Sequence, residues 1–257
     1  MPYARSQGLR IHYQVEGDGP PLVCQHGFGD CLESWYELGY VDALKDEYRL
    51  ILIDARGHGA SDKLHEPEAY SFHNVTADVV AVLDELAISK AHYFGFSMGG
   101  KNGFAMAAYA PDRLQSLTVL GTGSSAQDPA PLDRWIASLR QGPDAVPSIW
   151  ERDAPVSPAL RQRLLSNDLE ALIAQRVQRK DPEGFDAILP TLPMPCLLMA
   201  GEADPAYARV KASSCLIPGV TFVSFPRLGH TGSFLNRAEL VRHLRLFLSG
   251  PAGGRTA

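Results

Sequence analysis

The feature that most constrains this chain is the run Gly95-Phe96-Ser97-Met98-Gly99. It joins the apolar stretch 91–96, which predicts a buried strand, to the small-residue stretch 99–109, which predicts a helix. A serine inside so tight a strand-to-helix turn has a strained backbone, and side chains two residues away on either side would collide with neighbouring elements. Glycine at both places removes the collision. The pattern therefore predicts a serine held at the end of a buried strand.

Strands and helices alternate along most of the chain. We expect strands at 9–15, 22–24, 48–53, 91–96, 114–120, 196–200 and 221–225, and helices at 35–44, 72–86, 99–109, 206–216 and 238–248. Such alternation is typical of an α/β fold with a mostly parallel central sheet and helices on both faces.

One region departs from this rhythm. Residues 124–190 contain no good strand and show Pro-rich connections and helical patches instead. On a parallel sheet such an insertion would lie over the strand ends, where ligands bind. We predict a core formed by 1–123 and 191–250, a helical lid at 124–190, and a disordered tail at 251–257.

Composition excludes several classes of protein. The chain has 257 residues and a net charge of −5, with no long basic run, so we expect no nucleic-acid partner. No apolar run approaches the roughly 20 residues that span a bilayer, and no secretory signal is visible, so we expect no membrane association and a cytoplasmic location. The four cysteines form no C-x-x-C pair, and we predict neither a metal nor a cofactor. The oligomeric state is left open.

A serine hydroxyl needs a base that takes its proton. His230 lies just after the last expected strand and before the last expected helix, and we predict it as this base. The base in turn needs an acceptor that fixes its tautomer. Asp204 follows the strand 196–200 and gives the chain order serine, acid, histidine. Glu202 is the alternative acid, but the strand should finish before the acid turns inward.

The tetrahedral intermediate of acyl transfer carries an oxyanion, which requires preset N–H donors. One donor would be the backbone N–H of Met98, directly after the serine. The second should come from the loop His26-Gly27-Phe28-Gly29 after the strand at 22–24, with Phe28 as the donor. His26 itself is expected to hold this loop by hydrogen bonds.

These segments together resemble the α/β-hydrolase superfamily, and specifically an esterase- or lactonase-like member with a serine nucleophile. The matching runs keep the family order and cover nearly the whole chain outside 124–190. They are His26–Gly29, Asp54–Asp62, Gly95–Gly100, Gly201–Pro205 and Gly229-His230. The resemblance is specific for the fold and not for the substrate. It implies that Asp54–Asp62 has a structural role.

The predicted function is a carboxylesterase-like serine hydrolase that cleaves a small soluble ester, lactone or related acyl bond through an acyl-enzyme. Carbon–carbon hydrolase, thioesterase and perhydrolase chemistry would use the same triad. A receptor-like protein that binds a ligand with slow or no turnover is the alternative of a different class. A purely structural partner protein ranks last, because it would make no use of three aligned catalytic residues.

The predicted lid bears on the substrate. Residues 128–183 contain eight basic and nine acidic side chains, which we expect on an outer face in water rather than on a lipid surface. Trp35, Trp135 and Trp150 are candidate pocket residues, although packing alone explains each of them equally well. Lys101 is an unexplained polar residue in what should be a buried helix start.

Overall fold

The computed structural model describes residues 2–250 except 153 and 182. The predicted disordered tail, 251–257, lies outside the described residues. The strands are β1 (Tyr3–Ser6), β2 (Leu9–Glu16), β3 (Pro21–Gln25), β4 (Arg49–Ile53), β5 (Ala91–Phe96), β6 (Leu114–Leu120), β7 (Cys196–Gly201) and β8 (Thr221–Phe225).

Helices join and flank these strands. The α-helices are α1 (Glu33–Glu37), α2 (Tyr40–Leu44), α3 (Phe72–Glu85), α4 (Met98–Tyr109), α5 (Pro129–Leu139), α6 (Ala145–Trp150), α7 (Pro158–Leu165), α8 (Leu169–Gln178), α9 (Tyr207–Leu216), α10 (His230–Leu235) and α11 (Arg237–Ser249). Three short 3-10 helices are η1 (Pro67–Tyr70), η2 (Pro111–Arg113) and η3 (Asp186–Thr191).

The strands form one sheet of eight in the order β1-β2-β4-β3-β5-β6-β7-β8. From β4 to β8 every neighbouring pair is parallel, and β2 runs antiparallel to both of its neighbours, β1 and β4. The predicted mostly parallel sheet is therefore confirmed. Because the parallel strands share one direction, the loops after β3, β5, β7 and β8 all open at the same edge of the sheet.

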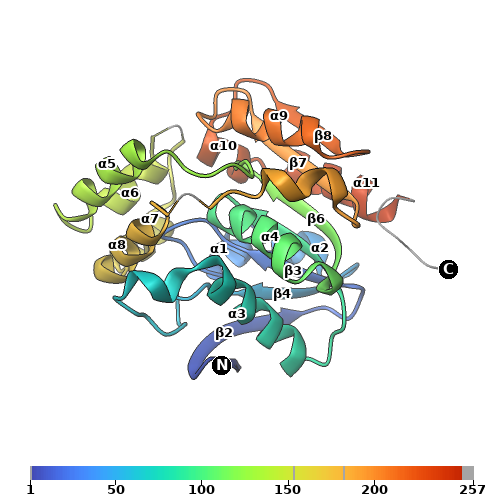
Figure 1. The fold of residues 1–257 in the computed structure, drawn as a ribbon, viewed down its shortest axis with the longest axis horizontal. Coiled ribbons are helices and arrows are strands. Elements are labelled where there is room, and N and C mark those ends of the chain that lie inside the picture. The colour runs from blue at the N-terminus through green and yellow to red at the C-terminus, as the bar shows by residue number, and fades with distance from the viewer. Residues whose placement is uncertain (1, 153, 182, 251–257) are drawn as a thin grey trace.

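Alternate residues of each strand enter two separate cores, as the pleat requires. One core joins Leu50, Leu52 and Phe94 to side chains of α2 and α11. The other joins Ile51, Tyr93 and Val119 to side chains of α3, α4 and α9. Helices thus cover both faces of the sheet (Figure 1), and burial on both faces explains why these strands are apolar throughout.

The region between β6 and β7 is helical, as predicted. It contains α5 to α8, which lie together beyond one end of the sheet (Figure 1). Two of these helices are capped by side chains: the hydroxyl of Ser157 accepts from the Leu160 N–H at 3.1 Å, and the carboxylate of Asp168 accepts from the Ala171 N–H at 3.0 Å. Such caps satisfy N–H groups that a helix start otherwise leaves unpaired.

One predicted helix is divided. The stretch 35–44 forms α1 and α2 with a break at Gly39, whose φ of 73° lies in the left-handed region. A glycine in this conformation ends α1, and its carbonyl accepts from Nη1 of Arg237 on α11 at 3.3 Å. Within the described residues, no helix is both long and apolar enough to cross a bilayer.

Candidate active site

The turn between β5 and α4 shows why its sequence contains two glycines. Ser97 has φ 53° and ψ −107°, a conformation that side-chain-bearing residues rarely adopt. A Cβ at Gly95 would lie 2.3 Å from the backbone of Gly99, and a Cβ at Gly99 would lie 2.2 Å from the carbonyl oxygen of Gln25. Both positions therefore require glycine, and the turn can be as tight as the motif predicts.

Three predicted site residues form one chain of hydrogen bonds. His230, the first residue of α10, has its Nε2 2.9 Å from Oγ of Ser97. Its Nδ1 lies 2.7 Å from Oδ2 of Asp204. With the proton on Nδ1 donated to the carboxylate, Nε2 is free to accept the proton of the serine hydroxyl. The arrangement can thus activate Ser97 as a nucleophile.

The structure brings only one of the two candidate acids to His230. Asp204 is buried after β7, and its second oxygen, Oδ1, accepts from the backbone N–H of Ala206 at 2.7 Å. Glu202 is exposed, and its carboxylate accepts from the hydroxyl of Ser224 at 2.9 Å. Because the strand ends at Gly201, the chain turns before Asp204 and aims that side chain inward.

The two predicted oxyanion donors lie in the loop after β3 and at the start of α4. Within the described part of the chain, no hydrogen bond uses the backbone N–H of Phe28 or Met98. The loop is held from two sides: the N–H of Ala55 donates to Nε2 of His26 at 3.1 Å, and Nε1 of Trp150 donates to the Phe28 carbonyl at 3.1 Å. Both N–H groups are thus available to an oxyanion.

The three candidate pocket tryptophans occupy different places. Trp35 is 1% exposed and packs edge-on against Tyr40 within the core. Trp135 on α5 lies edge-on to Phe28, with 5.6 Å between ring centres. Trp150 is also buried, so packing accounts for Trp35 and Trp150.

A cavity of about 40 Å³ adjoins the proposed nucleophile. Most of its lining is polar and comes from α4, α8 and the stretch after β6. The lining residues are Ser97, Met98, Lys101, Thr122, Gln127, Gln175, Arg176 and Arg179. None of the three tryptophans belongs to this set, so their role as pocket residues stays a prediction.

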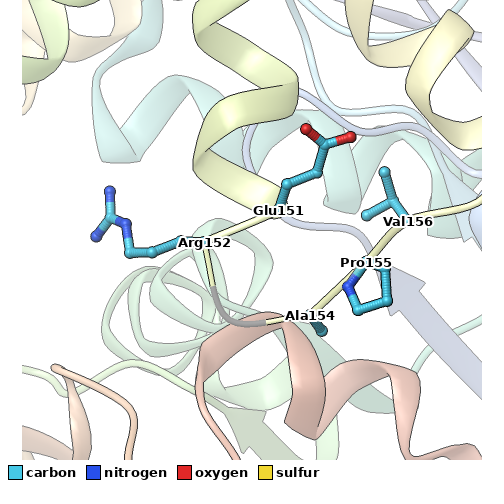
Figure 2. A pocket seen from close by; sticks show the side chains of 5 residues that line it. All are labelled: Glu151, Arg152, Ala154, Pro155 and Val156. Atoms are coloured by element: carbon cyan, nitrogen blue, oxygen red, sulfur yellow. The ribbon is translucent and has the colours of Figure 1, made fainter.

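A larger hollow of about 480 Å³ lies on the segment that follows α6. Its lining residues are Glu151, Arg152, Ala154, Pro155 and Val156. Figure 2 shows the side chains of Glu151 and Arg152 pointing away from one another. The lining contains none of the hydrogen-bonded trio, so this hollow is a surface recess apart from the chemistry.

The buried Lys101 now has a structural explanation. Its Nζ donates to the carbonyl oxygens of Ser124 and Ser125, which begin the helical region after β6. Burial lowers the pKa of Lys101 to about 7. The lysine thus ties α4 to the insertion and also presents a polar group to the cavity.

Sequence reasoning missed Arg176 and Arg179 as cavity residues. The mixed charges of 128–183 predicted side chains in water, which is wrong for these two arginines, because both turn toward the cavity. Arg179 is 7% exposed. The sequence feature that could have indicated this is the three-residue spacing of Arg176 and Arg179. It puts both on one face of α8 together with Gln175 and Leu172.

Comparison with known proteins shows the family to which the chain belongs. Residues 20–186 match a family model described as alpha/beta hydrolase fold. A putative 2-succinyl-6-hydroxy-2,4-cyclohexadiene-1-carboxylate synthase of Bacillus subtilis is 28% identical over 254 residues, covering 88% of this chain and 90% of the relative. The 3-oxoadipate enol-lactonase 1 of Acinetobacter baylyi is 35% identical over 120 residues, covering 46% and 43%. The solved enol-lactonase of Burkholderia xenovorans has the same fold, with a TM-score of 0.87, 24% identity, and coverage of 97% of this chain and 100% of its own.

The matched segment spans more than half of the chain, so this protein belongs to the α/β-hydrolase family. The resemblance predicted from the sequence motifs is confirmed.

Proposed function

We propose that this protein is a serine hydrolase that cleaves a small ester, lactone or related acyl bond. Ser97 attacks the carbonyl carbon while His230 takes the hydroxyl proton, and the resulting oxyanion accepts hydrogen bonds from the N–H groups of Phe28 and Met98. His230 then protonates the departing alcohol. In the second half of the reaction, His230 activates a water molecule, which hydrolyses the acyl-enzyme ester and releases the acid from Ser97.

The observation that carries this proposal is the continuous hydrogen-bond chain Ser97–His230–Asp204, with links of 2.9 and 2.7 Å. Both lengths are normal for hydrogen bonds that pass a proton. A protein that only bound its ligand would have no use for this chain. The receptor-like alternative is therefore less well supported than turnover.

Two further observations narrow the bond type and the size of the substrate. Epoxide and haloalkane hydrolysis would use an aspartate at the nucleophile position, where this chain has Ser97. The adjoining cavity of about 40 Å³ holds roughly three water-sized groups. So small a cavity has room for one small group of a substrate, which favours esters and lactones of modest size over long-chain lipids.

The test is covalent labelling by a fluorophosphonate, together with hydrolysis of p-nitrophenyl acetate, butyrate and palmitate. The Ser97→Ala variant should lose labelling and fall in kcat by roughly 10³-fold or more, because the nucleophile is gone and the fold is unchanged. Wild type should prefer the short esters. Labelling that persists in Ser97→Ala, or a preference for palmitate, would contradict the proposal.

A further inference from the structure

Three basic side chains share the cavity with Ser97, and two of them, Arg176 and Arg179, are positive at neutral pH. Lys101 comes from α4, and Arg176 and Arg179 come from α8 and its C-terminal end. Helix α8 also contacts the nucleophile turn, because Nε2 of Gln175 lies 3.2 Å from Sδ of Met98. The positive charges are therefore next to the predicted oxyanion site and not in a remote part of the insertion.

Aromatic rings hold the two arginines in place. The guanidinium carbon of Arg176 lies 3.6 Å from the ring centre of Phe28 and 4.5 Å from that of Trp135. That of Arg179 lies 3.6 Å from the ring centre of Phe72. Aromatic faces attract a cation and orient its plane, but they leave its charge and most of its N–H donors unused.

No carboxylate neutralises these arginines. Within the described residues neither forms a salt bridge, and Nε of Arg176 and Nη2 of Arg179 are buried with no hydrogen-bond partner. Glu183, whose charge acts on Arg179, accepts instead from the hydroxyl of Tyr109 at the surface. Burial and mutual repulsion lower the pKa of Arg176 to about 9, and burial lowers that of Arg179 to about 9, so both remain positive at neutral pH.

Two other arginines, Arg56 and Arg163, differ from Arg176 and Arg179 because each has a carboxylate partner. Nε of Arg56 is paired with the carboxylate of Asp78 at 2.6 Å. Nη2 of Arg163 lies 3.2 Å from Oδ1 of Asp30. A buried charge without a partner destabilises a fold, so its retention beside a catalytic serine indicates that a ligand supplies the partner.

We propose that this cavity binds a carboxylate of the substrate, so that the acyl compound cleaved at Ser97 carries a second, anionic end. The planar carboxylate matches the fork of an arginine, and it can accept from the unused N–H groups of Arg176 and Arg179. The cavity of about 40 Å³ has room for a group of this size. The inference rests on the proposed hydrolysis and names its substrate class: a half-ester of a dicarboxylic acid, or a lactone bearing a carboxylate.

The first test compares two substrates that differ only in charge, 4-nitrophenyl hydrogen adipate and its methyl ester. Wild type should show a kcat/KM at least about tenfold higher for the anionic ester. Arg176→Gln and Arg179→Gln should each reduce this ratio by roughly 10- to 100-fold, the range that a hydrogen bond to a charged group supplies. Lys180→Gln is the matched control, because it removes a positive charge at the same helix end from an exposed residue paired with Asp133. Equal rates for the two esters in wild type, or an unchanged ratio in both arginine variants, would overturn the proposal.

The second test needs no turnover. Adipate should raise the Tm of Ser97→Ala and fail to raise that of Ser97→Ala combined with Arg179→Gln. Dimethyl adipate should have no effect. A Tm rise with inorganic phosphate and none with adipate would show that the anion is not a carboxylate.

The two tests separate failure of this inference from failure of the proposed function. Adipate binding without hydrolysis of any ester would refute the hydrolase and keep the carboxylate site. Hydrolysis of the neutral ester, with no rise in Tm on addition of adipate, would support the hydrolase and refute the carboxylate site. Without ligand, Arg179→Gln should match or exceed the Tm of wild type, because it removes an unpaired buried cation. A large fall in Tm would assign Arg179 a structural role instead and overturn the inference.

Discussion

At the residue scale, the two carboxylate oxygens of Asp204 have different partners, and this difference orients His230. Asp204 binds the N–H of Ala206 with one oxygen, which fixes the carboxylate and aims the other oxygen at Nδ1 of His230. The ring is then fixed in the tautomer that leaves Nε2 facing Ser97. Glu202, only two residues away, has no such anchor and bonds to Ser224 at the surface.

This contrast gives a prediction for two paired variants. Asp204→Asn should lower kcat on the order of 10⁴-fold, because an amide can donate to the ring and favour the wrong tautomer. Glu202→Gln should change kcat by less than about threefold, since exposed hydrogen bonds contribute little. Steady-state kinetics with p-nitrophenyl butyrate would show it. If Glu202→Gln were the more damaging change, the acid would be Glu202.

Among the elements, the β5–α4 turn is the most tightly packed part of the site. The start of α4 lies against the backbone of β3, and the N–H of Gly99 donates to the carbonyl of His26 at 3.1 Å. A glycine at position 99 thus allows both the close approach and the position of the loop that carries Phe28. A Cβ on the next residue, Gly100, would lie 2.8 Å from the side chain of Val119 and 2.9 Å from that of Thr122, and 3.1 Å from the carbonyl oxygen of Gly95.

Alanine substitutions at Gly99 and Gly100 should show different losses of stability. Gly99→Ala should destabilise the protein by about 3 kcal/mol or more, because its Cβ would meet the carbonyl oxygen of Gln25, which cannot move without disturbing β3. Gly100→Ala should cost about 1–3 kcal/mol, the usual range for overpacking against side chains. Urea unfolding monitored by circular dichroism measures both. Equal losses would show that backbone crowding does not control this turn.

At the scale of the whole molecule, the core holds two histidines, His58 and His92, that are neutral at neutral pH. Burial lowers the pKa of His92 to about 4 and that of His58 to about 3. Both are neutral in the folded protein, where Nδ1 of His92 lies 2.7 Å from Oγ of Ser116. The unfolded chain takes up these protons near pH 6.5, so acid favours unfolding.

Stability should therefore fall as the pH drops from about 6.5 toward 4, by up to about 1.4 kcal/mol per pH unit for each of these histidines. His92→Asn should reduce the slope of unfolding free energy against pH. Each protein's unfolding free energy at pH 7 serves as the reference for its values at lower pH. His73→Asn, at an exposed position of α3, is the control and should leave the slope unchanged. Unfolding free energies from urea titrations at pH 7, 6, 5 and 4.5 measure the effect. A slope that is the same in His92→Asn and wild type would contradict it.

The fold was predictable because its signals are local. Strands β5, β6 and β8 begin and end at the predicted residues, since each is a short apolar run with turn residues at its ends. The turn glycines, the helix caps at Ser157 and Asp168, and the order of serine, acid and histidine are likewise readable along the chain. In each case the physical requirement acts between residues that are close in sequence, or follows from the shared direction of parallel strands.

Other features depend on which segments meet in space. Arg176 and Arg179 read as solvated charges in the sequence, yet the packing of α8 over Phe28 and Phe72 turns them inward. The sequence gives the charges and their helical spacing. The direction in which a charged helix face points depends on the elements that pack against the helix.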